Sequence, residues 1–232
     1  MKISKRLEAI SDFIEETDRL IDIGCDHAIL DIYLCEKYEN INVIASDIHE
    51  GALDQAISNI DRHDLVERIE TRLGDGLTIV NPSEFDTIVI SGMGFHNIKK
   101  ILSNDAKMIN YPKIVIQCNT DVVKLRKFVI KLGYMITREK LVMDNDIIYT
   151  VIEFKQGKEK YNYDQIYFGP RILENKDELF YEYYSKKLLK YENLLLQLPW
   201  YEVYNMFHHK HLIKIIGKQL QDKKDNIDLN NN

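Results

Sequence analysis

A short apolar run that ends in a glycine turn constrains the fold of this chain more than any other feature. Residues 20–27 read LIDIGCDH, which predicts a buried strand and then a tight turn into a helix. A second predicted strand, at 41–46, is followed by Asp47, 23 residues after Gly24. In a parallel α/β sheet this arrangement forms a nucleotide-sized crevice at the carboxyl edge of the strands.

The elements around this run alternate between strand and helix. Hydrophobic periodicity predicts strands at 20–23, 41–46, 69–73, 85–90 and 113–117, and helices at 3–14, 28–38, 51–60, 95–102 and 121–132. Two further strands, at 134–141 and 147–154, are joined by a polar turn and fit an antiparallel edge. This alternation predicts an α/β fold with a mostly parallel, doubly wound sheet.

The composition changes after a polar linker at 155–160, and no convincing strand follows it. Apolar residues at helical spacing predict two amphipathic helices, over 180–195 and 206–220, separated by Pro199. We therefore expect two domains. Residues 1–157 carry the parallel sheet, and residues 158–232 form a helical, coiled-coil-like hairpin.

The net charge of −6 hides an uneven distribution of charged residues. Residues 1–93 carry 8 Lys and Arg against 20 Asp and Glu, whereas residues 94–140 carry 10 against 3. Such a basic segment suits the binding of phosphate groups, although solvated helix faces are an alternative interpretation. The candidate phosphate contacts are Lys99, Lys100, Lys124, Arg126, Lys127 and Lys131.

Several classes of protein are disfavoured by the sequence. No apolar run approaches the roughly 18 residues of a membrane span, and the first residues lack the apolar core of a signal peptide, so we expect a cytoplasmic protein. The three cysteines form no CxxC pair, which disfavours zinc and a disulfide framework. We interpret the histidines at 208, 209 and 211 as a solvated helix face, and no metal is expected.

Acids and glycines at the strand ends indicate the class of ligand. The GxGxxG pattern of pyrophosphate sites is absent, because only Gly24 follows the first strand. S-adenosylmethionine has no phosphate, and its positive ammonium and sulfonium groups suit carboxylates. Taken singly, each acid could instead be a helix cap or a turn residue. The predicted cofactor-binding residues are Asp22, Gly24, Asp26, His27, Asp47, Gly74, Asp75, Gly76, Ser91, Gly92 and Met93.

Two further strand ends bear on the methyl acceptor. Residues 91–94 lack the Asn/Asp-Pro-Pro-aromatic signature of many amino-group methyltransferases, which favours a ring nitrogen, whose in-plane lone pair is already available. After the strand at 113–117, the amides of Gln117 and Asn119 could pair with the edge of a base. Capping of the following helix is the alternative role for them.

With these motifs the chain resembles the TrmK family of bacterial tRNA (adenine-22-N1)-methyltransferases, over almost its whole length. The family's D-I-G-S-D-H-A-Y-L-P stands here at residues 22–31, and its G-D-G-L at 74–77. Its A-G-M-G-G stands at 91–95, its Q-P-N at 117–119 and its late G-P at 169–170. Departures from these patterns include Ile29, Asp31, Phe95 and Cys118.

The resemblance implies a class I, Rossmann-like methyltransferase domain and a C-terminal coiled-coil-like domain. It implies transfer of a methyl group from S-adenosylmethionine to N1 of adenine 22, in the D-arm region of tRNA. The family's catalytically important aspartate falls on Asp26, where a carboxylate would stabilise the base as it becomes cationic. We expect the protein to act as a monomer.

Three alternatives to this function remain open from the residues alone. The chain could be a methyltransferase for another RNA or for a protein. It could be a non-catalytic RNA-binding module that keeps only the fold. An oxidoreductase is the third alternative, and the missing glycines disfavour it.

Overall fold

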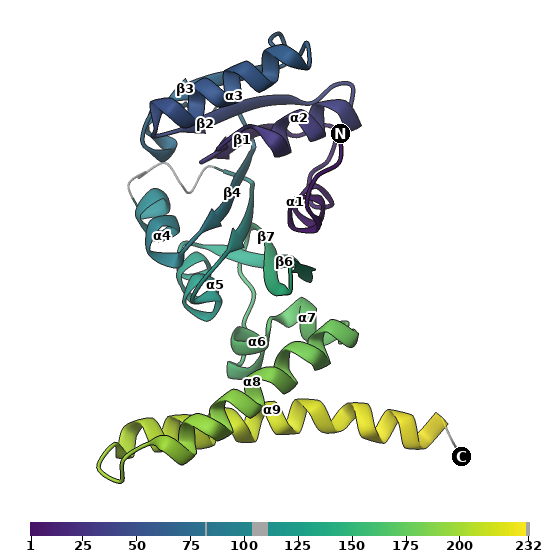
Figure 1. The fold of residues 1–232 in the computed structure, drawn as a ribbon, viewed down its shortest axis with the longest axis vertical. Coiled ribbons are helices and arrows are strands. Elements are labelled where there is room, and N and C mark those ends of the chain that lie inside the picture. Colours follow the sequence, from purple (N-terminus) through teal and green to yellow (C-terminus); the bar gives the residue numbers. More distant parts are fainter. Residues whose placement is uncertain (82, 104–110, 231–232) are drawn as a thin grey trace. The chain divides into compact units, whose positions relative to one another are not determined.

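A seven-stranded sheet with helices on both faces forms most of the molecule (Figure 1). The computed structural model describes residues 1–81, 83–103 and 111–230. The strands are β1 (Arg19–Ile23), β2 (Asn42–Asp47), β3 (Ile69–Leu73), β4 (Thr87–Met93), β5 (Lys113–Cys118), β6 (Tyr134–Asp144) and β7 (Ile147–Gln156). The helices are α1 (Lys5–Ser11), α2 (Ile29–Lys37), α3 (Glu50–Arg62), the 3-10 turn η1 (Gly76–Ile79), α4 (Phe95–Ser103), α5 (Val122–Lys131), α6 (Tyr163–Phe168), α7 (Pro170–Glu174), α8 (Glu178–Gln197) and α9 (Val203–Asn230).

The strand order is β3-β2-β1-β4-β5-β7-β6. The first five strands pair in parallel, and β7 and β6 add an antiparallel edge. The sequence prediction of a mostly parallel, doubly wound sheet is therefore confirmed. Because β1 and β4 lie next to each other while their connections run to opposite sides, the strand order reverses between them. Ligands bind at such a point in open α/β sheets.

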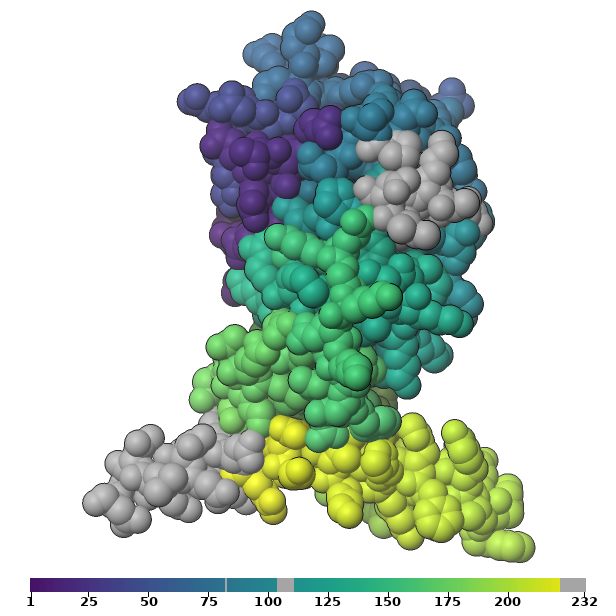
Figure 2. Space-filling view, turned by 180° about the vertical axis from the view of Figure 1, so that it is seen from behind, coloured from purple at the N-terminus to yellow at the C-terminus, as the bar shows by residue number. Residues whose placement is uncertain are grey.

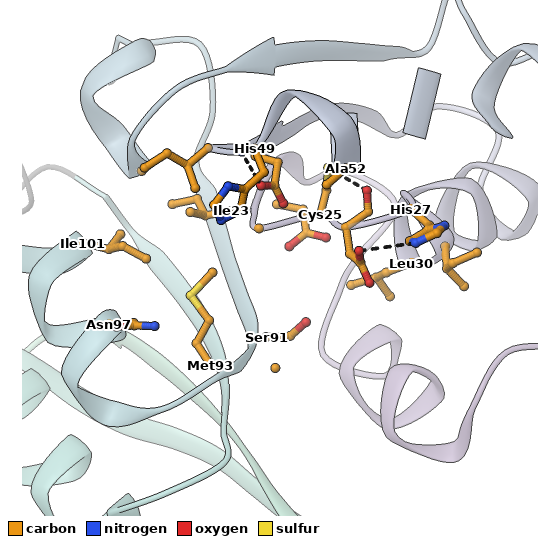
Figure 3. Close-up of a pocket in the computed structure, with 18 of the residues that line it drawn as sticks. Ile23, Cys25, His27, Leu30, His49, Ala52, Ser91, Met93, Asn97 and Ile101 are labelled. Atoms are coloured by element: carbon orange, nitrogen blue, oxygen red, sulfur yellow. Dashed lines mark hydrogen bonds and ion pairs between the residues drawn. The ribbon is translucent and has the colours of Figure 1, made fainter. Parts of the chain in front are cut away.

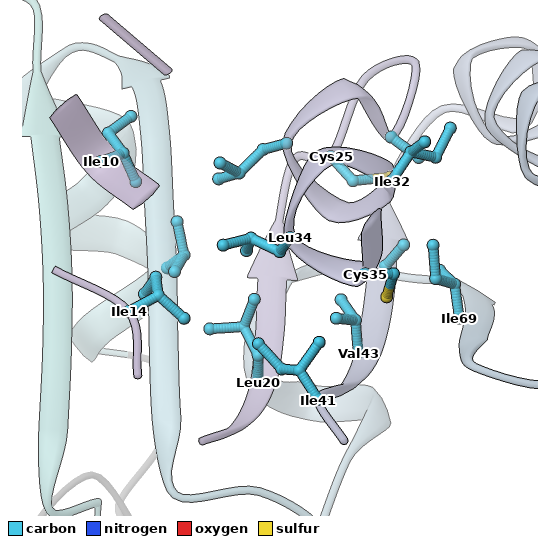
Figure 4. Close-up of a cluster of buried hydrophobic side chains, with 14 of the residues drawn as sticks. Ile10, Ile14, Leu20, Cys25, Ile32, Leu34, Cys35, Ile41, Val43 and Ile69 are labelled. Atoms are coloured by element: carbon cyan, nitrogen blue, oxygen red, sulfur yellow. The ribbon is translucent and has the colours of Figure 1, made fainter. Parts of the chain in front are cut away.

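Apolar side chains alternate between the two faces of the sheet and form one core on each. Leu20 of β1 packs in the core that includes residues of α1, α2 and α3, and Figure 4 shows part of that core. Its neighbour Ile21 packs in the other core, with residues of α4 and α5. A strand buried on both faces needs the continuous apolar sequence that identified β1 and β4.

The boundary between the two compact units lies after Leu173, not after residue 157 as expected from composition. The reason is a buried ion pair, since Nε of Arg126 donates to Oε1 of Glu139 at 2.6 Å. The same guanidinium donates to the carbonyl of Tyr167 at 3.2 Å, and the backbone N–H of Arg171 donates to Glu139. Residues beyond the expected linker are thus fixed to the sheet unit.

Gly169 explains the late Gly-Pro motif. Its φ is +100°, and a Cβ at this position would lie 2.6 Å from a carboxylate oxygen of Glu139 and 2.7 Å from a guanidinium nitrogen of Arg126. Only glycine allows the chain to pass so close to the ion pair.

The second unit, Glu174–Asn232, contains two long helices that pack against each other as a hairpin. The α8 helix begins at Asp177, whose carboxylate accepts from the backbone N–H of Phe180 at 2.8 Å. The predicted helices were shorter at both ends than α8 and α9. In the part of the chain that the structure describes, no helix combines the length and apolarity needed to cross a membrane.

Candidate functional site

A cavity of about 460 Å³ opens at the carboxyl ends of β1, β2 and β4, and β3 leads into its wall through η1. All eleven predicted cofactor-binding residues line it. Figure 3 shows side chains from the β1–α2 turn, the β2–α3 turn, the end of β4 and α4 around one hollow, with His27, His49, Ser91 and Asn97 labelled. The acids at successive strand ends therefore converge as expected from the parallel sheet.

The turn between β1 and α2 forms the cavity floor and is locally strained. Gly24 has φ +78°, a conformation that favours glycine, and a Cβ there would lie 2.3 Å from Cε of Met93, so the end of the Met93 side chain would have to move. Asp26 and Ala28 follow with φ of +52° and +56°, a conformation that non-glycine residues rarely adopt. Backbone strain of this kind is concentrated at functional sites.

Asp22 is the most unusual acid in the cavity. It is 2% exposed, and its Oδ1 is buried without a hydrogen-bond partner. Burial and, to a smaller extent, the charge of Asp47 raise the pKa of this carboxyl to about 7, against the opposing effect of Arg6. A buried carboxylate without a partner is costly, and a ligand cation beside it would remove part of that cost. The residues present therefore fit the positive groups of S-adenosylmethionine.

The other acids already have partners in the protein. Oδ1 of Asp47 accepts from the backbone N–H of His49 at 2.8 Å, which fixes the carboxylate at the end of β2. Oδ2 of Asp75 forms an ion pair with Nζ of Lys100 at 3.0 Å. Both carboxylates keep one oxygen for a ligand, so neither bond excludes a role in binding.

Asp26 lies at the open side of the cavity. Its side chain is 79% exposed, in contrast to buried Asp22, and its Oδ1 lies 3.5 Å from Nε2 of His27. An exposed carboxylate at the rim can face a second, larger substrate, whereas the buried one faces the ligand in the cavity. The two acids of the β1–α2 segment are thus suited to different partners.

Gln117 and Asn119 form a closed hydrogen-bonded ring with the backbone of Gly92. The Gly92 N–H donates to Oε1 of Gln117 at 3.0 Å, Nε2 of Gln117 donates to Oδ1 of Asn119 at 2.9 Å, and Nδ2 of Asn119 donates to the Gly92 carbonyl at 2.7 Å. Arg6 adds a bond from NH1 to Oε1 of Gln117 at 2.8 Å. This amide ring lies at a β-bulge, where the register of β4 against β5 shifts between Ile90 and Met93.

The amide ring changes the interpretation of both residues. The side chain of Gln117 is fully buried, and its oxygen and nitrogen are already used within the protein. Gln117 is therefore not free to pair with a base, in contrast to the role that the sequence suggested for it. Asn119 is exposed, but its amide is also part of the ring, and neither residue lines the cavity.

Comparison with known families decides between the classes of ligand that such a cavity could hold. The family model described as "TrmK: tRNA (adenine(22)-N(1))-methyltransferase" matches residues 20–224. The chain belongs to the TrmK family. The tRNA (adenine(22)-N(1))-methyltransferase of Bacillus subtilis is 26% identical over 235 residues, which cover 98% of each chain.

Solved structures of TrmK relatives agree with this membership. A Streptococcus pneumoniae protein in complex with S-adenosyl-L-methionine is 28% identical, with a TM-score of 0.86, over 94% of this chain and all of the other. Mycoplasma capricolum TrmK in complex with S-adenosyl-homocysteine is 27% identical, with a TM-score of 0.84, over 95% and 99% of the two chains. The similarity therefore extends over both the sheet unit and the helical hairpin.

The departures at Ile29, Asp31, Phe95 and Cys118 lie in different surroundings. Ile29 lines the cavity, and Asp31 is fully buried, with neither carboxylate oxygen hydrogen-bonded. Burial, and then Asp22, raise the pKa of Asp31 well above its usual value. Phe95 and Cys118 are buried in the second core. Of these four residues, Ile29 alone lines the cavity.

Five of the six predicted phosphate contacts are exposed on α4 and α5, namely Lys99, Lys100, Lys124, Lys127 and Lys131. The prediction for Arg126 is wrong, because its side chain is 2% exposed and pairs with Glu139. Lys113, which also contributed to the basic count of this segment, is buried against Asp18. The basic surface is therefore smaller than the charge count of 94–140 indicated.

Three cavity residues with charged, imidazole or amide side chains escaped the sequence analysis. Arg6 comes from α1, His49 from the start of α3 and Asn97 from α4. Arg6 sits on an amphipathic helix, and nothing in the sequence distinguishes it from a solvated arginine. Across the ranges that the structure describes, no group of three or more His, Cys, Asp and Glu could hold a metal ion.

Proposed function

We propose that this protein transfers the methyl group of S-adenosylmethionine to N1 of adenine 22 in tRNA. The observation that carries the proposal is the convergence of Asp22, Asp47 and Asp75 on one cavity with a strained glycine turn. Membership of the TrmK family supports the same reaction. No cradle for a pyrophosphate is present at the first turn, which disfavours a dinucleotide and hence an oxidoreductase.

The cavity residues would hold the cofactor by charge and shape. When bound, S-adenosylmethionine supplies a methyl group that is already activated by its sulfonium. Asp22 would face a positive group of the cofactor, because its Oδ1 is buried without a partner. Asp47 is the last residue of β2, at the spacing from Gly24 that reaches ribose hydroxyls. The protein then contributes position and electrostatics rather than a new nucleophile.

Asp26 is the residue that we assign to the chemical step. The lone pair of adenine N1 forms the new bond as the carbon–sulfur bond breaks, so no proton has to be removed from the base. The base becomes cationic, and a carboxylate at the cavity rim stabilises that charge as it develops. N1 faces a pairing partner or the tRNA core, so the base must leave its stack to reach the rim.

The context of the reaction follows from its substrates. We propose that the protein works as a monomer. We place the activity in the cytoplasm, where tRNA is modified. Its exposed lysines on α4 and α5 would bind phosphates of the tRNA.

Nucleoside analysis tests the proposed function. The protein is incubated with an unmodified tRNA transcript and methyl-labelled S-adenosylmethionine, and the RNA is digested to nucleosides. We expect label only in 1-methyladenosine. Label in another nucleoside, label in protein, or cofactor binding without transfer to any tRNA would each contradict the proposal.

A further inference from the structure

The turn between α8 and α9 exposes a concentrated apolar surface. Within residues 196–207, six large apolar side chains are exposed, namely Leu196, Trp200, Tyr201, Val203, Tyr204 and Phe207. Trp200 is 84% exposed and Tyr204 is 82% exposed. Figure 2 shows this segment, in yellow-green, at one end of the helical unit. Exposed apolar side chains that gather in this way mark an interaction site.

The aromatic members of this surface are held on an ordered frame. We call Trp200, Tyr201, Tyr204 and Phe207 the aromatic tip. The rings of Trp200 and Tyr201 meet edge to face at 5.9 Å, and the ring of Tyr204 is parallel to that of His208 at 6.4 Å. The turn is closed by a hydrogen bond from the Glu202 N–H to the Pro199 carbonyl at 3.0 Å. Trp200, Tyr201 and Tyr204 thus contact neighbouring rings and remain largely exposed.

The charge around the aromatic tip decides the kind of partner. Residues 186–218 contain six lysines and two acids, a balance of +4, and Lys190, Lys210 and Lys214 are exposed. Two copies of so basic a surface would repel each other. Lysines that attract phosphates, combined with aromatic faces that stack on bases, are the pattern of proteins that bind unpaired nucleotides.

We propose that the aromatic tip stacks on unpaired bases of the tRNA substrate, with the neighbouring lysines on the adjoining phosphates. This inference rests on the proposed function for the identity of the RNA. The turn of the hairpin would then recognise loops of the RNA. Bases are unpaired and accessible in loops, whereas a duplex hides them. Stacking has little sequence preference, so the contact adds affinity for many tRNAs rather than choosing among them.

The protein carries its own probe for this contact, because Trp200 is the one tryptophan in the sequence. The full chain is titrated with unmodified tRNA in the absence of any cofactor, and tryptophan emission and its quenching by acrylamide are followed. We expect saturable quenching by tRNA and protection of Trp200 from acrylamide. A duplex RNA of the same length should bind through its phosphates with little change in emission.

Variants separate stacking from other uses of an apolar surface. Trp200→Leu should weaken tRNA binding about tenfold, as expected for the loss of one stacked base, whereas Trp200→Phe should recover most of the affinity. Leu196→Ala is the matched control, because Leu196 is 85% exposed on the same surface but has no ring, and its affinity for tRNA should be unchanged.

Specific results would overturn the inference. One is tRNA binding that leaves the emission of Trp200 and its quenching by acrylamide unchanged. Another is an equal loss of tRNA affinity in Leu196→Ala and Trp200→Leu. A third is a blue shift of the Trp200 emission that appears with anionic vesicles or with rising protein concentration but not with tRNA. The experiment needs no methyl transfer, so quenching by tRNA without methylation would contradict only the proposed function. Methylation without quenching would contradict only the stacking contact.

Discussion

At the scale of single residues, Asp22 links burial to ligand affinity. Its pKa is raised to about 7, so the carboxyl is mostly protonated below that pH and mostly ionised above it. A cationic ligand prefers the ionised form. Between about pH 6 and pH 7.5 the ionised fraction rises from about one tenth to about three quarters, so affinity should rise roughly eightfold.

Calorimetry with S-adenosylmethionine over this pH range measures the change in affinity. The whole range lies below the pKa of the ligand's own amino group, which is about 8, so that group stays mostly protonated. In Asp22→Asn the affinity should be lower, and nearly independent of pH. His27 and His49 also line the cavity and are unchanged in this variant. An equally steep pH dependence in Asp22→Asn would show that another group is responsible and contradict the prediction.

Gln117 acts through the amide ring rather than on the base. Gln117→Glu keeps the acceptor for Arg6 and Gly92 but replaces the donor to Asn119 with an oxygen, so two acceptors face each other. The end of β4 should then lose its position. We expect kcat/KM for tRNA to fall about tenfold, the usual effect of one broken buried hydrogen bond, with cofactor affinity within about twofold of the original.

The control for this variant is Gln55→Glu, the same change at an exposed position on α3. It should leave both quantities unchanged. A fall in cofactor affinity as large as the fall in kcat/KM would show that the amide ring supports the whole cavity, and would exclude a specific role on the acceptor side.

The sequence could reveal the cofactor residues but not the amide ring. Parallel strands end at one edge, so acids and glycines after consecutive strands must meet, and their spacing alone places them. The partners of a buried polar side chain are set by contacts distant in sequence. Arg6 lies 111 residues from Gln117, and Arg126 lies 13 residues from Glu139 on another element. No local pattern marks either pair.

At the scale of elements, the ion pair of Arg126 and Glu139 holds residues 158–173 to the sheet. Both side chains are buried, with exposed fractions of 2% and 0%. Burial raises the pKa of Glu139, and Arg126 opposes that shift. Glu139→Ala leaves a buried guanidinium without its carboxylate, which costs about 3–5 kcal/mol. Urea denaturation should show a loss of this size in the free energy of unfolding.

Lys186→Ala serves as the control, because it breaks an ion pair with Glu182 on the helix surface. The side chain of Lys186 is 66% exposed. Such pairs on a helix surface contribute about 0.3–0.5 kcal/mol. Similar losses in the two variants would contradict a special role for the buried pair.

The longer elements were predictable and the shorter ones were not. Strands and helices with a full apolar period, such as β1 and α3, follow from sequence to within a few residues. The η1 turn, α6 and α7 have four to six residues, too few for a period to show. The one local signal for α6 is its capping box, in which Asn162 and Gln165 exchange hydrogen bonds. Missing α6 and α7 placed the domain boundary too early.

At the scale of the whole molecule, the cofactor cavity is lined by acidic residues, whereas the proposed surface for tRNA carries exposed lysines. Lys124, Lys127 and Lys131 are exposed on α5 with helical spacing. If they bind phosphates, replacing all three by Gln should weaken tRNA binding and reduce the slope of log affinity against log salt by about two to three.

The control is Lys37→Gln, because Lys37 is exposed on α2, which packs on the opposite face of the sheet from α5. Filter binding over a range of salt concentrations measures both variants. An unchanged slope for the triple variant would remove α5 from the tRNA-binding surface.

Primer extension on treated tRNA tests the central claim most directly, because a methyl group on N1 blocks the pairing edge of adenine and stops reverse transcriptase. After incubation with S-adenosylmethionine, a transcript with adenosine 22 should give a stop at that position, and a transcript with guanosine 22 should give none. With saturating S-adenosylmethionine, Asp26→Asn should still bind tRNA but give at most about one hundredth of the stop, as expected when charge stabilisation is lost. A stop at another position, or a full stop with Asp26→Asn, would contradict the account.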